Sequence, residues 1–135
     1  MDLMKITRIS AAGMQVQSER LRVVAENLAN ADSTGTTPGS EPYRRRTISF
    51  AEGLNKELGL PTVRVSRYGV DQSPFDREYD PGHPAADENG YVLRPNVNPV
   101  VEMVDMREAQ RGYEANLSVI ETTRTMVQRA LDLLR

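Results

Sequence analysis

Apolar residues near the start of the chain recur at the spacing of an amphipathic helix. Between residues 3 and 31 one row of positions falls on alternating steps of three and four, with Thr7, Ser10 and Gln17 filling its polar places. Its apolar members are Leu3, Met14, Leu21, Val24, Leu28 and Ala31. A second apolar row lies beside it and consists of Ile6, Ile9, Gly13, Val16 and Val23. The pattern predicts one long helix whose wide apolar face has more than one packing partner.

The end of the chain carries a longer row of the same kind. After Pro99, positions on steps of three and four continue without a break, and only Gln110 and Arg124 among them are polar or charged. The apolar members are Met103, Met106, Tyr113, Leu117, Ile120, Val127, Leu131 and Leu134. At 1.5 Å per residue the two predicted helices are roughly 45 Å and 50 Å long. Because their lengths match, we expect them to pair as an antiparallel coiled coil.

The middle of the chain has a different pattern. Residues 30–42 are turn formers and small polar residues, which predict a loop. Strands are expected over Tyr43–Phe50, Thr62–Val70 and Tyr91–Leu93, and a short helix over Ala51–Leu58. The predicted fold is therefore mainly α with a small β-rich insert. Residues 1–31 and 99–135 are expected to form a polymerisation domain, and residues 32–98 a central, turn-rich β body.

Composition limits how stable such a chain can be on its own. Aromatic residues make up 5% of the sequence and Trp is absent, so the side chains that contribute most to core burial are scarce. The central body is too small to cover two long helices, and isolated helices are marginal in water. We therefore expect the helices to be partly disordered until the chain joins an assembly that covers their apolar faces.

Charge and cysteine content argue against several function classes. The 17 basic and 19 acidic residues are mixed along the chain, so neither nucleic acid nor a membrane surface is an expected partner. No apolar run approaches the roughly 20 residues that span a bilayer, and no secretory signal peptide is recognisable. Without cysteine there is no thiolate metal site or cysteine nucleophile. The sequence predicts no cofactor, no small-molecule substrate and no enzyme activity.

A few residues invite sharper hypotheses. His83, the single histidine, has Asp80 and Asp87 nearby in the sequence, but one imidazole is weak support for a metal site. The carboxylates between Asp71 and Asp80 are expected to be solvated rather than an acid/base pair. Arg44, Arg45 and Arg46 lack the extended basic face of a nucleic-acid binder, so salt bridges between subunits are the better expectation for them.

Four segments resemble a known family. The segment AENLANADST at 25–34 is similar to a signature shared by flagellar rod, hook and hook-associated axial proteins. Three further segments resemble the narrower FlgC family of proximal rod proteins, and they stand in that family's order. They are YDPGHPAADENGYV at 79–92, PNVNPVVEMVDM at 95–106 and EAQRGYEAN at 108–116. The resemblance covers essentially the full chain.

The resemblance implies a structural subunit of the flagellar basal-body rod, which polymerises through paired terminal helices into part of the torque-transmitting drive shaft. It implies export by the flagellar type III apparatus without a cleaved signal peptide, and a place in the periplasmic rod. The implied partners are other rod proteins and copies of the chain. The assembly residues expected are Leu21, Val24, Asn27, Leu28, Asn30, Met103, Met106, Tyr113, Leu117, Ile120, Val127, Leu131 and Leu134.

The role of the signature amides has two interpretations. The Asn27 and Asn30 side chains can donate and accept hydrogen bonds across an interface. Asn30 can also simply end the first helix, because Asn tolerates the conformation of a helix C-terminus. For the whole chain, the alternatives are another rod or hook-base component, which shares the first signature, and a cytoplasmic coiled-coil adaptor.

Circular dichroism of the isolated chain separates the rod subunit from the adaptor. A rod subunit should show low or heat-labile helicity and protease-sensitive termini, because its apolar faces await partners. A thermally stable helical pair in the isolated chain would instead favour the adaptor.

Overall fold

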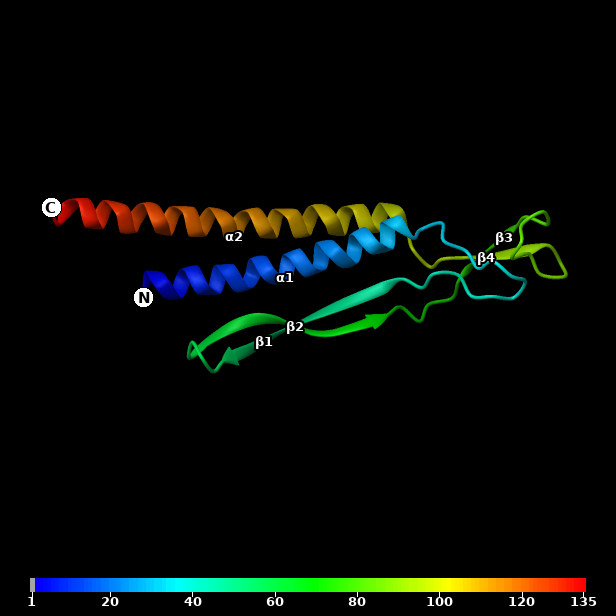
Figure 1. The fold of residues 1–135 in the computed structure, drawn as a ribbon, viewed down its shortest axis with the longest axis horizontal. Coiled ribbons are helices and arrows are strands. Elements are labelled where there is room, and N and C mark those ends of the chain that lie inside the picture. Colours follow the sequence, from blue (N-terminus) through cyan, green and yellow to red (C-terminus); the bar gives the residue numbers. More distant parts are fainter. Residues whose placement is uncertain (1) are drawn as a thin grey trace. The chain divides into compact units, whose positions relative to one another are not determined.

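The fold consists of two long helices with four strands between them. The computed structural model describes residues 2–135, and its elements follow in the order α1 (Leu3–Ala29), β1 (Arg46–Asn55), β2 (Leu60–Val70), β3 (Asp76–Tyr79), β4 (Tyr91–Arg94) and α2 (Pro99–Leu133) (Figure 1). The strands form two separate two-stranded sheets, β1 with β2 and β3 with β4. This confirms the mainly α fold with a small β insert. No helix within residues 2–135 is long and apolar enough to cross a membrane.

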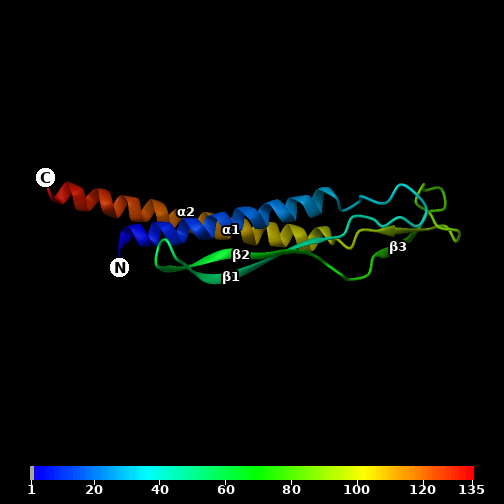
Figure 2. The same cartoon turned by 60° about the horizontal axis from the view of Figure 1, so that its bottom comes forward.

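Part of each long helix belongs to each of two compact units. Unit 1 contains Met1–Leu21, Ile48–Arg67 and Arg107–Arg135, and unit 2 contains Arg22–Thr47 and Tyr68–Met106. In unit 1 the helical segments run side by side in both views (Figures 1 and 2). Their contacts pair Gly13 with Asn116, and Arg20 with Glu108. Residue numbers along α1 rise while those of their contact partners on α2 fall, so the two segments are antiparallel.

Small and polar residues, rather than large apolar ones, line the helix contact in unit 1. A Cβ atom on Gly13 would lie 2.8 Å from Nδ2 of Asn116, and one on Gly112 would lie 3.0 Å from Nε2 of Gln17. Each helix thus provides a glycine that receives an amide from the other helix. Within the described part of the chain, Oε1 of Gln17 is buried without a hydrogen-bond partner.

The row of buried residues on α2 differs by one position from the row predicted from the sequence. Ala109 and Thr123 are buried and Asn116 is half-buried, at a spacing of seven residues. The predicted row members Leu117 and Leu131 are exposed. The predicted positions Met106, Tyr113 and Ile120 are half-buried, whereas the inward-facing residues that alternate with them lie one position before the predicted Gln110, Leu117 and Arg124. The physical reason is that Gly13 and Gln17 of α1 accept small or amide-bearing partners and leave no room for leucine.

The helix predicted over Ala51–Leu58 is wrong. Strand β1 continues to Asn55, where the side-chain Oδ1 accepts hydrogen bonds from the backbone N–H groups of Glu57 (3.0 Å) and Leu58 (3.3 Å). Gly59 then adopts a φ of +63°, which glycine tolerates without a Cβ clash, and β2 begins. The sequence from Asn55 to Gly59 is thus a hairpin turn, and turn chemistry outweighs the helical propensity of Glu57 and Leu58.

The second sheet lies in unit 2. Strands β3 and β4 are antiparallel, with Asp76 opposite Arg94 and Tyr79 opposite Tyr91. The short strand predicted at Tyr91–Leu93 is confirmed, whereas β3 was not predicted as a strand. Oδ1 of Asp87 accepts hydrogen bonds from the N–H groups of Asn89 and Tyr91, both 2.9 Å, in the turn before β4. The hydrogen bond from Tyr91 is the main reason why the pKa of Asp87 lies below its ordinary value.

Gly13→Leu should loosen the helix contact of unit 1, although leucine favours helix formation more than glycine does. The added side chain meets the Asn116 amide, and overpacking of this kind costs about 1 to 3 kcal/mol. Hydrogen exchange of the α1 amides in the full chain measures the effect. Ala11→Leu is the matched control, because Ala11 is exposed on the same helix. Equal protection in both variants would contradict the proposed close contact.

Candidate assembly interface

The signature residue Asn27 is the centre of a buried polar junction in unit 2. Its side chain is 1% exposed and forms four hydrogen bonds. Nδ2 donates to the backbone oxygen of Arg46 (2.9 Å) and to Oε2 of Glu102 (3.2 Å). Oδ1 accepts from the backbone N–H of Arg46 (2.9 Å) and from the hydroxyl of Tyr43 (2.8 Å). The amide is therefore fully satisfied, and it joins the end of α1 to the start of β1 and the start of α2.

Glu102 supplies the negative charge of this junction. Its side chain is completely buried, and the guanidinium of Arg45 donates a short hydrogen bond to Oε1. Arg45 also lies 3.7 Å from Asp71 and 3.6 Å from Asp105. Burial alone would lower the pKa of Arg45, but its hydrogen bond and charge interaction with Glu102 outweigh burial and raise that pKa. The guanidinium therefore stays charged and compensates the buried carboxylate.

Tyr43 and Asn96 close the junction on its remaining sides. Burial is the largest cause of the raised pKa of Tyr43, so its phenol stays protonated and donates to Asn27. Oδ1 of Asn96 accepts from the backbone N–H of Arg45 (2.7 Å), and its Nδ2 donates to the backbone oxygen of Asp71 (3.0 Å). Each of these side chains therefore has a hydrogen-bond partner within the chain.

Asn30 has a local role. Its Nδ2 donates to the backbone oxygen of Glu26 (2.9 Å), and its Oδ1 accepts from the hydroxyl of Ser33 (3.0 Å). These bonds cover the last turn of α1, as expected of a residue that ends a helix. The two signature amides therefore differ: Asn27 links separate elements and Asn30 ends one.

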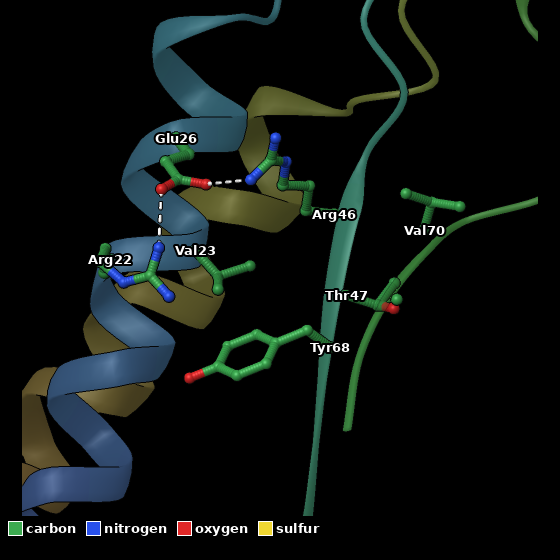
Figure 3. Close-up of a pocket in the computed structure, with 8 residues that line it drawn as sticks. Arg22, Val23, Glu26, Arg46, Thr47, Tyr68 and Val70 are labelled. Carbon is green, nitrogen blue, oxygen red and sulfur yellow. Dashed lines mark hydrogen bonds and ion pairs between the residues drawn. The ribbon is translucent and has the colours of Figure 1, made fainter. Parts of the chain in front are cut away.

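A groove lies beside this junction, between α1 and the base of the β1–β2 hairpin in unit 2 (Figure 3). Its volume is about 410 Å³, and Val23, Thr47, Gly69 and Val70 contribute to its lining. Figure 3 shows Glu26 between two arginines, 2.8 Å from Arg22 and 3.3 Å from Arg46. Arg22 also lies over the ring of Tyr68.

The three consecutive arginines, residues 44–46, contact other side chains of the same chain. Arg44 lies over the ring of Phe75, with 4.2 Å from its guanidinium carbon to the ring centre, while Arg45 pairs with Glu102 and Arg46 with Glu26. Each of the three arginines thus has a partner within the chain, and salt bridges between subunits stay a prediction. His83 is engaged as well, because its Nδ1 accepts from the N–H of Ala85 (3.0 Å) and its Nε2 lies 3.2 Å from the Thr34 hydroxyl.

The residues expected at the assembly interface fall into two groups. Val24 and Asn27 are buried, and Leu21, Leu28, Asn30, Met106, Tyr113 and Ile120 are half-buried. The exposed group consists of Met103, Leu117, Val127, Leu131 and Leu134. The first group packs within the chain, and the second forms an apolar row on α2 that the described residues cover only in part.

Sequence reasoning missed Glu102, Arg45 and Tyr43 as a group. A signal for Glu102 did exist, since it is the one charged residue among Val100, Val101, Met103 and Val104. A carboxylate in such a run is either the exposed side of a helix or a buried partner. Only the structure shows which, because the side chain that pairs with it lies 57 residues away.

Known proteins similar to this chain are flagellar. The family described as flagellar basal body rod FlgEFG protein C-terminal matches residues 88–133. Flagellar basal-body rod protein FlgC of Agrobacterium fabrum is 54% identical over 129 residues, which cover 96% of this chain and 93% of the relative. The FlgC of Salmonella typhimurium is 41% identical over 133 residues, with 98% of each covered. The FlgC of Borreliella burgdorferi is 40% identical, with 100% of this chain and 99% of the relative covered.

Glu102→Ala should lower the free energy of unfolding by about 1 to 3 kcal/mol, because it removes the buried carboxylate that pairs with the half-buried Arg45 guanidinium and accepts a hydrogen bond from the buried Asn27 amide. Urea denaturation followed by tyrosine fluorescence measures the change. Glu108→Ala is the control on the same helix: its side chain is 68% exposed and pairs with Arg20, so its loss should cost under about 1 kcal/mol. Equal losses in the two variants would contradict a structural role for the junction.

Proposed function

The chain belongs to the FlgC family of flagellar basal-body rod proteins, and from this membership we propose that it is a structural subunit of the proximal rod that polymerises through its two terminal helices. Its place is the flagellar basal body, and its partners are other rod components and copies of itself. Assembled subunits form part of the drive shaft that transmits torque. The relatives from Agrobacterium fabrum and Salmonella typhimurium match this chain along nearly their full length, which does not favour another rod component or a cytoplasmic adaptor.

The exposed apolar row on α2 is the observation that carries this proposal. Met103, Leu117, Val127, Leu131 and Leu134 are between 37% and 83% exposed. Several large apolar side chains exposed along one helix are typical of a surface that another protein covers. In a rod wall the row would be buried against helices of neighbouring subunits. Each buried side chain would then contribute about 1.5 to 3 kcal/mol.

The contact between the two helices within one chain has a different role in this proposal. Residues 1–31 and 99–135 act together as the polymerisation domain and pair as an antiparallel coiled coil, while residues 32–98 form the central body. The glycine and amide contacts between the helices define the register, since each glycine accepts only one facing side chain. The large apolar side chains stay available for neighbours.

Export fits a chain with these properties. The proposed route is the flagellar type III apparatus, without a cleaved signal peptide, into the periplasmic part of the basal body. The buried apolar residues are small, namely Val16, Val23, Val24, Ala85, Val92 and Ala109. A core of this kind holds the chain weakly enough to be unfolded for passage. The saturated polar junction supports a structural role and no enzyme activity.

Leu117→Asp or Leu131→Asp should abolish motility while leaving expression and export largely intact, because a carboxylate would be buried unpaired in the rod wall. Swimming in soft agar and the subunit content of purified basal bodies measure the outcome. Ser118→Asp is the control, since it adds the same charge at an exposed polar position on α2. A motile strain that carries both leucine substitutions would count heavily against the proposal.

A further inference from the structure

The start of α2 is inverted relative to an ordinary amphipathic helix. Glu102 is completely buried, while its neighbours Val100, Val101, Met103 and Val104 are 69%, 47%, 56% and 60% exposed. The polar junction around Glu102 occupies the inward side of this helical turn. The four apolar side chains therefore point to the protein surface. These four residues form an apolar patch that we name the head surface. Singly exposed apolar residues are common, but four within five positions indicate a binding surface.

An acidic hollow borders the head surface in unit 2. Its volume is about 460 Å³, and Pro99, the first residue of α2, lines it together with Asp32, Asp76, Glu78 and Arg94. Glu78 pairs with Arg94 at 2.6 Å. Asp32 and Asp76 form no ion pair within residues 2–135. The head surface therefore combines exposed apolar side chains with two carboxylates that are ready to accept a cation.

The other end of α2 has the complementary composition. In unit 1 the end of α2 extends beyond the start of α1 in both views (Figures 1 and 2), and we name residues 124–135 the tail. Leu131, Leu133 and Leu134 of the tail are 53%, 85% and 83% exposed. Its three arginines and one aspartate give a formal charge of +2. The arginines, Arg124, Arg129 and Arg135, form no ion pair in the part of the chain that the structure describes.

We propose that the tail of one copy docks on the head surface of a second copy. The leucines of the tail cover Val100, Val101, Met103 and Val104, and its arginines approach Asp32 and Asp76 across the hollow. Opposite charges bring the correct surfaces together, while the apolar contacts provide most of the affinity. The inference rests on the proposed polymerisation and adds to it the surface and the partner.

The proposed contact has a definite symmetry. Head surface and tail are different surfaces, so a contact between them is heterologous, and each copy that binds through its tail leaves its own head surface free. Such a contact can add subunits repeatedly in one direction, and it builds an open helix when the rotation between copies does not close a ring. A rod needs this property, whereas contact between two identical patches would stop at a dimer.

Disulfide cross-linking tests the contact cleanly, because the chain contains no cysteine. Two differently tagged full-length copies are expressed in the same cells, one with Val101→Cys and the other with Leu133→Cys. Both positions are exposed, so folding should be preserved. After oxidation of purified basal bodies, a non-reducing gel should show a species that contains both tags. Replacing Leu133→Cys by Ser118→Cys, also exposed on α2, should abolish it.

Each outcome of this experiment decides something different. A cross-link from either cysteine to a protein of another mass would overturn the second copy as the occupant and leave the rod function intact. The absence of any cross-link from both positions would overturn the docking itself. If neither tagged copy is recovered in basal bodies while both are expressed, the proposed function fails together with the contact.

A charge exchange adds an independent measurement. Asp32→Lys with Asp76→Lys in the head copy should reduce the cross-link yield roughly tenfold, because like charges then face each other. Adding Arg129→Glu and Arg135→Glu to the tail copy should restore the yield. All four positions are exposed, so loss of folding does not explain a restored signal. An unchanged cross-link yield with the two lysine substitutions in the head copy would contradict the charge contact.

Discussion

The structure of unit 2 depends on one buried amide. Asn27 reaches the backbone of Arg46, the hydroxyl of Tyr43 and the carboxylate of Glu102, and so connects three elements that are far apart in the sequence. An apolar residue at this position could fill the space but would remove the hydrogen bonds that Asn27 makes to the Arg46 backbone and to Glu102. The signature residue is therefore explained by the hydrogen bonds it makes inside its own chain.

That constraint determines what the rest of α2 presents to its surroundings. Because Glu102 is turned inward to meet Asn27 and Arg45, the residues on either side of it are turned outward. One helical repeat further along, Ala109 is buried, and Asn116 and Thr123 follow on the same side. The bulky row with Leu117 and Leu131 is consequently left on the outside.

Elements with a strong local pattern were predictable from the sequence. The long helices followed from their apolar spacing, and β2 and β4 from β-branched alternation and from the Asn89-Gly90 turn. The helix expected over Ala51–Leu58 was wrong because Asn55 and Gly59 form a turn whose effect is stronger than local propensity. Alternate positions of the predicted row on α2 were displaced by one residue, because a hydrophobic pattern does not contain the amide and glycine contacts at Gly13 and Gln17. The pairing of Arg45 with Glu102 joins residues 57 positions apart, so no short-range pattern contains it.

The leucines left exposed on α2 have a consequence for the life of the chain before assembly. Leucine does not discriminate among apolar surfaces, so a free chain in a crowded cell would adhere to other chains as readily as to a rod tip. Correct assembly then requires that the free chain stays at low concentration or bound to another protein, and that it is released next to its assembly site. The apolar surface that we propose to join subunits in the finished rod makes the timing of release important for assembly.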